Sequence, residues 1–260
     1  MPLRTVTATR YVTPLREGGS LPAIVEASDG GTYVLKFRGA GQGDKALIAE
    51  LLAGELARRL ELPVPEIVLC ELDPLLGRGE PDAEIQALIR ASAGRNLALD
   101  YLPGSITFDP LLTPRPDAAL ASAIVWFDAL VSNVDRTVRN TNLLIWHRQL
   151  YLIDHGAALV FHHAWRGDSE IADSKFIPVK DHVLLGLADD VAGADQRLAP
   201  RLDGALLAAL ADELPEEWLT DPVFAGPAAM RRAYVDYFVR RLEEPRAFAE
   251  EAERVRARAV

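Results

Sequence analysis

Hydrophobic and polar positions over residues 9–37 follow a pattern that predicts β-structure. The short apolar run Ala23–Ala27 and the β-branched and aromatic run Thr32–Phe37 flank the polar segment Ser28-Asp29-Gly30-Gly31. Asp-Gly and Gly-Gly supply the positive φ that a tight turn needs. The region therefore predicts two strands joined as a β-hairpin.

Helix and strand patterns then alternate up to about residue 102. A glycine-rich link at 39–43 leads to Asp44, a residue type that caps helices, and to an Ala-, Leu- and Glu-rich stretch, 45–60, that predicts a helix. Pro63 and Pro65 end this helix. The next expected elements are a strand over Glu66–Leu72, a helix over 83–91 and a strand over Asn96–Leu102, which stops at Pro103-Gly104.

The second half of the chain is expected to be mainly helical. The strongly apolar stretch Asp117–Val131 predicts a buried helix, and the polar segment Ser132–Asn142 after it predicts a loop. Leu143–Trp146 and Leu150–Ile153 resemble two short strands. Beyond these the chain is mostly helical and ends in one charged helix over Ala229–Ala259.

This order of elements predicts an α+β fold of two lobes around a cleft. A β-hairpin inside the helical half, with polar residues on both flanks, would face that cleft. We expect a β-rich N-lobe at residues 1–102, a sheet plus one helix, and a mainly helical C-lobe at 103–260. The two prolines within 113–116 mark a second candidate boundary.

Composition narrows the possible functions. The 260 residues are 49% hydrophobic and 25% charged, as in an ordinary globular protein. A net charge of −10 repels phosphate backbones, so we expect no nucleic-acid partner. The single cysteine, Cys70, excludes an internal disulfide and a cysteine-rich zinc site. We find no apolar signal-peptide core and no apolar window of about 18 residues, so we expect a cytoplasmic protein with no membrane partner.

Three polar residues in the second half carry the candidate chemistry. Asp135 and Asn140 stand five positions apart, and Asp154 follows fourteen residues later in Ile153-Asp154-His155-Gly156. Protein kinases place an Asp, an Asn five residues on, and an Asp-Phe-Gly motif in this order. A carboxylate can orient a hydroxyl nucleophile and accept its proton, and Asn and Asp oxygens suit Mg²⁺.

Asp and Asn are also common in loops for purely local reasons, so this spacing alone is not diagnostic. Here the pair lies between an apolar helix and a hairpin and is followed by Asp154, which favours the functional interpretation. Gly156 is expected to let the backbone bend away from a metal.

Lys36 ends the run Tyr33-Val34-Leu35-Lys36, which is similar to the Val-Ala-Ile-Lys strand of kinases. A lysine there can hold the α and β phosphates, although a solvated edge-strand lysine is the alternative. A helix carboxylate usually orients such a lysine, and the 45–60 helix offers Glu50 and Glu55. Both flank the Ala/Leu face, so periodicity does not choose between them.

The remaining nucleotide contacts are inferred from order along the chain. Gly18, Gly19 and Ser20 are the one candidate phosphate loop before Lys36, although they are not G-x-G-x-x-G and an ordinary hairpin turn is equally compatible. The strand that ends at Leu102 would connect the lobes. Its backbone, from Asp100 to Leu102, could pair with adenine.

Taken together, the chain resembles the HipA-like kinases, a bacterial branch of the kinase superfold that is also similar to phosphatidylinositol kinases. The residues that carry the resemblance span about residues 12–160 and are Tyr33-Val34-Leu35-Lys36-Phe37, Ala49-Glu50-Leu51-Leu52-Ala53, Leu62-Pro63-Val64-Pro65, Asn133-Val134-Asp135-Arg136 with Asn140, and Ile153-Asp154-His155-Gly156.

The resemblance implies a role for each matching residue. Lys36 would bind the ATP phosphates with Glu50 as its partner, Asp135 would be the catalytic carboxylate, and Asn140 and Asp154 would bind Mg²⁺. It also favours Glu50 over the other helix glutamate.

Three features depart from the family pattern. Thr137 stands where related lipid kinases carry a histidine after Asp-Arg, and the metal motif reads Asp-His-Gly in place of Asp-Phe-Gly. The chain also lacks an obvious equivalent of the N-terminal subdomain of longer toxin-type members, which argues against a toxin role and a paired antitoxin.

The expected function is an ATP- and Mg²⁺-dependent kinase that transfers the γ-phosphate to a hydroxyl group. The acceptor would be a protein Ser/Thr or a small molecule. Two alternatives are a nucleotide-binding pseudokinase that acts as an interaction module and an AMP-transferring enzyme on the same fold.

Overall fold

The structure is a computed structural model that describes residues 3–15, 21–41, 43–111, 114–166 and 170–259. Five strands near the N-terminus form a closed barrel in the order β1-β2-β3-β5-β4. Neighbouring strands are antiparallel except β1 and β4, which pair in parallel. The strands are β1 (Thr5–Pro14), β2 (Ala23–Ala27), β3 (Thr32–Lys36), β4 (Ile67–Leu72) and β5 (Gly94–Asp100).

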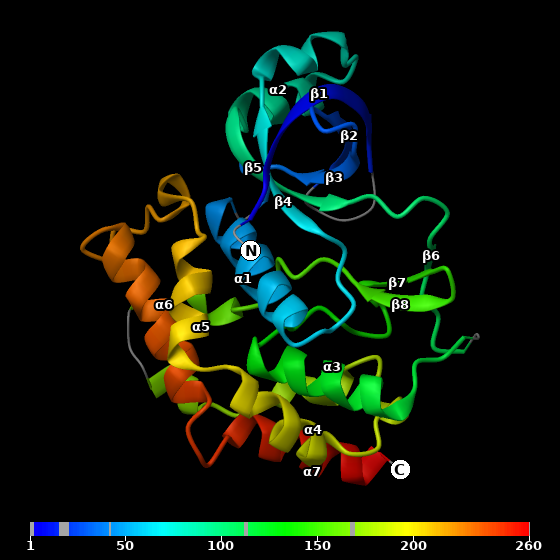
Figure 1. Ribbon diagram of the computed structural model, residues 1–260, viewed down its shortest axis with the longest axis vertical. Coiled ribbons are helices and arrows are strands. Elements are labelled where there is room, and N and C mark those ends of the chain that lie inside the picture. The colour runs from blue at the N-terminus through cyan, green and yellow to red at the C-terminus, as the bar shows by residue number, and fades with distance from the viewer. Residues whose placement is uncertain (1–2, 16–20, 42, 112–113, 167–169, 260) are drawn as a thin grey trace.

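Below the barrel, as drawn in Figure 1, lie a three-stranded sheet and most of the helices. The small sheet has the order β6-β7-β8. Its strands are β6 (Ile106–Thr107), β7 (Leu143–Trp146) and β8 (Gln149–Leu152). The α-helices are α1 (Asp44–Arg59), α2 (Ala83–Ala91), α3 (Ala118–Leu130), α4 (Val191–Leu198), α5 (Gly204–Asp212), α6 (Pro227–Arg241) and α7 (Ala247–Ala259). Short 3₁₀ helices are η1 (Pro74–Gly79), η2 (Val160–His163), η3 (Glu170–Asp173), η4 (Ile177–Asp181), η5 (Leu185–Leu187), η6 (Ala199–Arg201) and η7 (Glu216–Trp218).

Buried hydrophobic residues form two clusters, one inside the barrel and a larger one around the helices. Alternation decides which face of a strand joins which cluster, because successive side chains point to opposite faces. On β4, Val68 and Cys70 belong to the barrel interior, whereas Ile67 and Leu69 join the larger cluster. The larger cluster therefore continues from the strands through α1 into the helical region.

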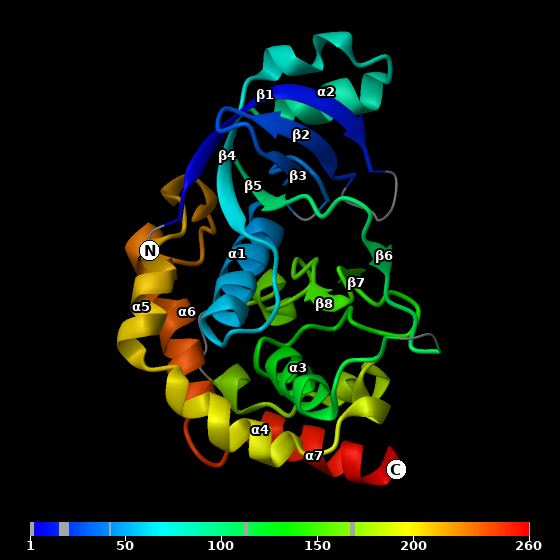
Figure 2. The ribbon, with the colours of Figure 1, turned by 45° about the vertical axis from the view of Figure 1, so that its right-hand side comes forward.

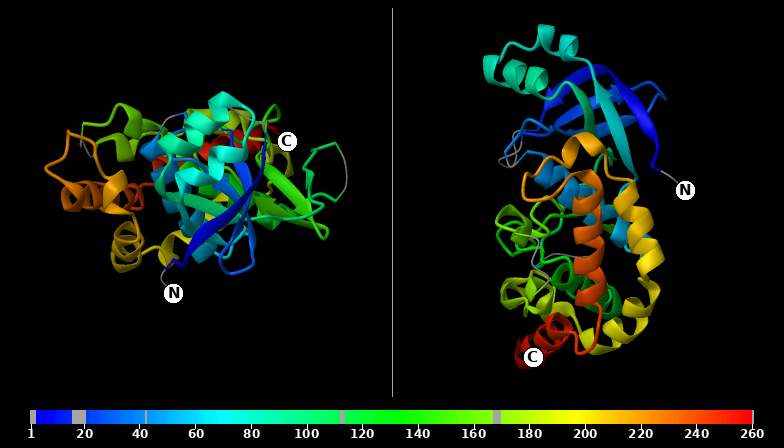
Figure 3. Two further views of the ribbon diagram at one scale, coloured as in Figure 1. Left: turned by 90° about the horizontal axis from the view of Figure 1, so that it is seen from above. Right: turned by 90° about the vertical axis from the view of Figure 1, so that its left-hand side faces the viewer.

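Helix α1 lies between the barrel and helices α3, α4 and α7 in both views (Figures 1 and 2), whereas α2 lies at the top beside the barrel. Every residue from Leu47 to Ala57 is buried, including the two glutamates. The barrel stands at one end of the molecule and α6 and α7 run along and under the helical region (Figure 3). Because one core joins residues on both sides of position 102, the division into lobes at 1–102 and 103–260 stays a prediction.

Most of the expected elements are confirmed within a residue or two at each end. The final helix was predicted wrongly as one element over Ala229–Ala259, since the structure has α6 and α7 separated near Pro245. Proline has no N–H to continue a helix, which accounts for the break. Among the described residues no helix is long and apolar enough to cross a membrane.

The start of α1 also differs from expectation. Gly43, with φ at 64°, is the N-cap, and Asp44 is the first helical residue. Glycine accepts this left-handed conformation at little cost. The carboxylate of Asp44 lies 3.4 Å from Arg38 and does not cap the helix.

Candidate active site

Lys36, Glu50 and Asp154 meet although they come from three distant parts of the chain. The Lys36 Nζ lies 3.0 Å from Glu50 Oε2 and 2.5 Å from Asp154 Oδ1. Glu50 is fully buried, the Lys36 side chain is 12% exposed, and Asp154 is 43% exposed. The ion pair of Lys36 and Glu50 is thus covered by protein, while the Asp154 carboxylate opens toward solvent.

Burial and ion pairing act in opposite directions on these groups. Burial alone would lower the pKa of Lys36, but the carboxylates of Glu50 and Asp154 outweigh it and raise that pKa above its ordinary value. Burial alone would raise the pKa of Glu50, whereas the charge of Lys36 and the nearby His155 hold it well below the ordinary range. Lys36 and Glu50 are therefore charged at neutral pH.

Contacts at both ends of α1 fix the position of Glu50. Near the helix start, Lys45 Nζ lies 2.7 Å from Asp221 and donates to the carbonyl of His162 at 2.6 Å. Beyond the helix end, Arg201 donates to the carbonyl of Leu60 at 3.2 Å. All of these partners lie in the helical region, so α1 is held against it.

The structure distinguishes the two glutamates that periodicity could not. Five helical positions correspond to about 500°, so Glu50 and Glu55 project in directions about 140° apart. Glu50 faces Lys36, and Glu55 pairs with Arg58 at 2.5 Å on its own helix. The lysine partner that the resemblance favoured is therefore the one in contact.

Asp154 follows β8 after one intervening residue, Ile153. Its own φ is 56°, in the left-handed region that Asp adopts more readily than most residues. Gly156 lies in the turn that follows Asp154 and His155, and it is not among the residues with positive φ, so the turn does not use a conformation that favours glycine.

The loop after α3 places Asp135 among amide side chains. Asn140 Nδ2 donates to Asp135 Oδ2 at 2.7 Å, and Asn142 Nδ2 donates to the same oxygen at 3.2 Å. The Asp135 backbone N–H donates to Asn133 Oδ1 at 3.1 Å. Asp135 Oδ1 accepts no hydrogen bond from any residue that the structure describes.

A buried ion pair holds this loop and joins it to the segment that carries Asp154. Arg136 Nε donates to Asp128 Oδ2 at 2.5 Å, and both side chains are fully buried. Arg136 Nη1 also donates to the carbonyl of Asn142, whose oxygen accepts from the Ile153 N–H at 3.1 Å. Ile153 precedes Asp154, so one guanidinium fixes the placement of the loop relative to the segment that carries Asp154.

Asp128 has two further partners. His182 Nε2 donates to Asp128 Oδ2 at 2.8 Å, because its Nδ1 accepts from the Leu184 N–H at 3.1 Å. Asn133 Nδ2 donates to Asp128 Oδ1 at 3.0 Å. Burial alone would raise the pKa of Asp128, but the charge of Arg136 and the hydrogen bond from His182 hold it well below the ordinary range.

Sequence reasoning missed Asp128 and His182. The available signal was a single carboxylate within the otherwise apolar helix, since a buried charge needs a partner. The partner could not be named, because His182 is 54 residues away along the chain.

Asp128→Ala is expected to lower the free energy of unfolding by about 3–5 kcal/mol, because it leaves Arg136 as an uncompensated buried charge. Replacing both residues, as Asp128→Leu with Arg136→Met, should cost much less. Urea denaturation of the three proteins measures this. A loss for Asp128→Ala near the about 0.5 kcal/mol typical of exposed positions would contradict it.

The same ion pair predicts a pH dependence. The pKa of Asp128 is lower in the folded than in the unfolded protein, so its contribution is present above the unfolded value of about 3.9 and is lost as the pH falls below it. Denaturation midpoints at decreasing pH should fall less steeply for the double variant than for the parent. Equal slopes would show that Asp128 titrates normally.

The structure describes only some of the other residues that were predicted to contact the nucleotide. Gly18, Gly19 and Ser20 lie outside the described residues. Asp100 is the last residue of β5, and Leu102 lies two residues beyond it. The Asp100 N–H donates to the Glu66 carbonyl at 2.8 Å. The Leu102 N–H has no acceptor among the residues that the structure describes.

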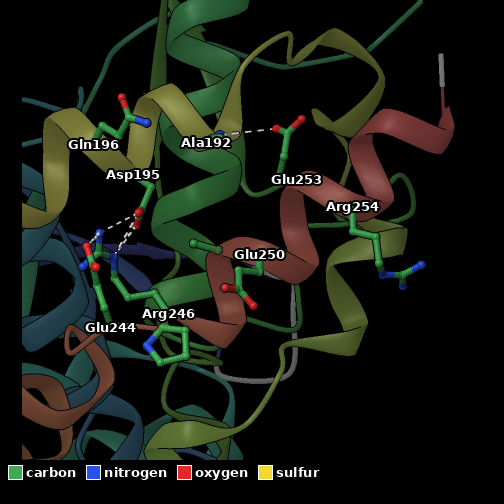
Figure 4. A pocket seen from close by; sticks show the side chains of 10 residues that line it. Ala192, Asp195, Gln196, Glu244, Arg246, Glu250, Glu253 and Arg254 are labelled. Atoms are coloured by element: carbon green, nitrogen blue, oxygen red, sulfur yellow. Dashed lines mark hydrogen bonds and ion pairs between the residues drawn. The ribbon is translucent and has the colours of Figure 1, made fainter.

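A separate pocket of about 840 Å³ lies between α4 and α7 (Figure 4). Its lining residues come from 192–196 and 244–254, much later in the sequence than Lys36. Some of its polar side chains are already paired: Arg246 lies 2.8 Å from Asp195, and Glu253 accepts from the Ala192 N–H at 3.3 Å. None of the predicted site residues lines it.

Comparison with known proteins decides the family. The family model described as HipA-like kinase matches residues 9–249. This chain belongs to the HipA-like kinase family. The match extends well beyond the residues that carried the resemblance, and it confirms that interpretation. As a HipA-like kinase, the protein is a kinase-type phosphotransferase.

One solved structure supports the fold. The crystal structure of a Helicobacter pylori proinflammatory kinase, CtkA, is similar with a TM-score of 0.57 and 13% identity over 99% of each chain. A Golgi casein kinase with Mn/ADP bound is more distant, with a TM-score of 0.45 and 15% identity over 96% of this chain and 75% of that chain. No curated relative matches the chain.

Proposed function

We propose that this HipA-like kinase uses ATP and Mg²⁺ to transfer the γ-phosphate to a hydroxyl group of a protein Ser/Thr or of a small molecule. The observation that carries the proposal is the contact of Lys36 with both Glu50 and Asp154. A cation held by a buried glutamate and placed beside a solvent-exposed carboxylate suits phosphates that arrive with a metal.

Asp154 and Asn140 carry oxygen atoms of the type that magnesium binds. Asp154 Oδ2 accepts no hydrogen bond from the described residues, since the lysine contact uses Oδ1. Asn140 uses its Nδ2 toward Asp135, which leaves its carbonyl oxygen for another ligand. Asp154 and Asn140 would hold Mg²⁺, which neutralises charge on the phosphate oxygens when it is bound.

Asp135 is the group we assign to the acceptor. The amides of Asn140 and Asn142 both reach Oδ2, which fixes the carboxylate and leaves Oδ1 free. That oxygen would orient the acceptor hydroxyl and take its proton as the phosphate transfers. Lys36 would hold the α and β phosphates during this transfer.

Adenine would bind where β5 ends. The N–H of Leu102 has no partner in the described part of the chain, and an unpaired backbone donor there suits a ring nitrogen. The segment Gly18, Gly19 and Ser20 would cover the phosphates, since it connects the paired strands β1 and β2.

Incubation with ATP labelled in the γ or the α phosphate tests the proposal. We expect label on the protein or in inorganic phosphate from γ-labelled ATP only, in the presence of Mg²⁺ and not of chelator. Stable label from α-labelled ATP, with an added mass of one adenylate, would mean AMP transfer. Mg-ATP binding without turnover of either label would mean a pseudokinase.

A further inference from the structure

His155 is a fully buried histidine with no hydrogen-bond partner at either ring nitrogen among the described residues. The Oε1 of Glu50 is likewise buried and without a hydrogen bond. The two groups face each other, with His155 Nδ1 3.6 Å from Glu50 Oε1. A buried carboxylate oxygen and a buried imidazole nitrogen that are both unsatisfied need only a small approach to satisfy each other.

The surroundings of the ring leave it little freedom. Phe127 from α3 packs against it in a T-shaped arrangement, with ring centres 6.1 Å apart and planes at 80°. Gly54, one helical turn after Glu50, is also close to the ring: a Cβ there would overlap Ile67 and come within 3.9 Å of His155 Nδ1. The His155 carbonyl accepts from the Ala158 N–H at 2.8 Å. The ring is thus held against α1, the helix that carries Glu50.

We propose that His155 is a positioning residue: its Nδ1–H donates to Glu50 Oε1 and fixes the carboxylate so that Oε2 meets Lys36. This inference rests on the proposed function of Lys36 in phosphate binding. The phenylalanine that protein kinases carry at this place in the motif has no N–H to donate. Here the residue after the metal-binding aspartate is also coupled to the glutamate that orients the lysine.

Two substitutions at His155 separate hydrogen bonding from packing. His155→Phe keeps a ring of the type kinases use, but removes the donor. His155→Asn places an amide N–H near the Nδ1 position. We expect His155→Phe to raise the KM and Kd for Mg-ATP about tenfold or more, because hydrogen bonds to charged groups are among the stronger ones. The kcat should change less, and His155→Asn should restore most of the affinity.

The second part repeats His155→Phe in a Glu50→Met background. Methionine has a similar shape and no carboxylate oxygens, so the loss of the donor should have no further effect on nucleotide affinity. If His155 and Glu50 contribute independently, the double variant should lose affinity by the product of the two single-variant factors, and that result would overturn the proposal. The matched control is His163→Phe, a change at an exposed histidine that contacts none of these residues and should leave KM unchanged.

A spectroscopic measurement covers the case in which His155→Phe does not fold. Nitrogen chemical shifts of the His155 ring in the parent should show a proton on Nδ1 in a hydrogen bond, and Glu50→Met should remove that signature. A parent ring protonated on Nε2 alone would overturn the proposal. If the parent fails to bind Mg-ATP, the proposed function fails; if it binds and turns over while His155→Phe matches it, only the role of His155 fails.

Discussion

Asp135→Asn is expected to lower the rate of phosphoryl transfer by about 100- to 10,000-fold while Mg-ATP still binds. Asparagine keeps the size of the side chain and an oxygen that can accept from Asn140, but it cannot take a proton from the acceptor hydroxyl. The loop should keep its conformation, because the buried ion pair of Asp128 and Arg136 holds it without involving the Asp135 side chain.

Single-turnover transfer from γ-labelled ATP measures the loss, and nucleotide titration measures binding. Asp212→Asn, at an exposed position at the end of α5, is the matched control and should behave as the parent. Parent-like turnover by Asp135→Asn would make Asp135 structural and would leave the reaction without its assigned carboxylate.

Asp154→Asn is expected to remove most of the stabilisation that Mg-ATP gives the parent. A ligand that binds only the folded state stabilises it by about 2.7 kcal/mol at about 100 times its dissociation constant. Asp154 supplies the charged oxygen we assign to the metal, so its replacement by a neutral amide weakens the binding of the metal and of the nucleotide that the metal accompanies. The same change also removes the ion pair with Lys36. Melting temperatures with Mg-ATP, and with ATP plus chelator, measure this protection.

Comparison with Asp135→Asn separates the two carboxylates. Asp135 is assigned to the acceptor, so its variant should keep most of the protective shift or even increase it, since one negative charge near the phosphates is removed. Equal loss of protection in both variants would mean that the carboxylates share the metal. The absence of any shift in the parent at millimolar Mg-ATP would count against the nucleotide site itself.

Features that depend on neighbouring residues were predictable from sequence. The hairpin around Asp29-Gly30, the strand that ends at Lys36 and the loop that carries Asp135 follow from turn residues and from period-two alternation. These patterns reflect backbone preferences and the burial of one face, which act over a few positions. The order of such motifs was also enough to indicate the kinase family. The match of the family model to residues 9–249 confirms that family.

Pairings between distant segments were decided only by the tertiary structure. Periodicity left Glu50 and Glu55 equivalent, and the packing of α1 turned Glu50 alone toward Lys36. The sequence equally gave no indication of the partners of Asp128 or of the position of His155 next to Glu50 on α1. A side chain's electrostatic partner is set by which helices and strands pack together, and long-range packing leaves no short periodic signal in the sequence.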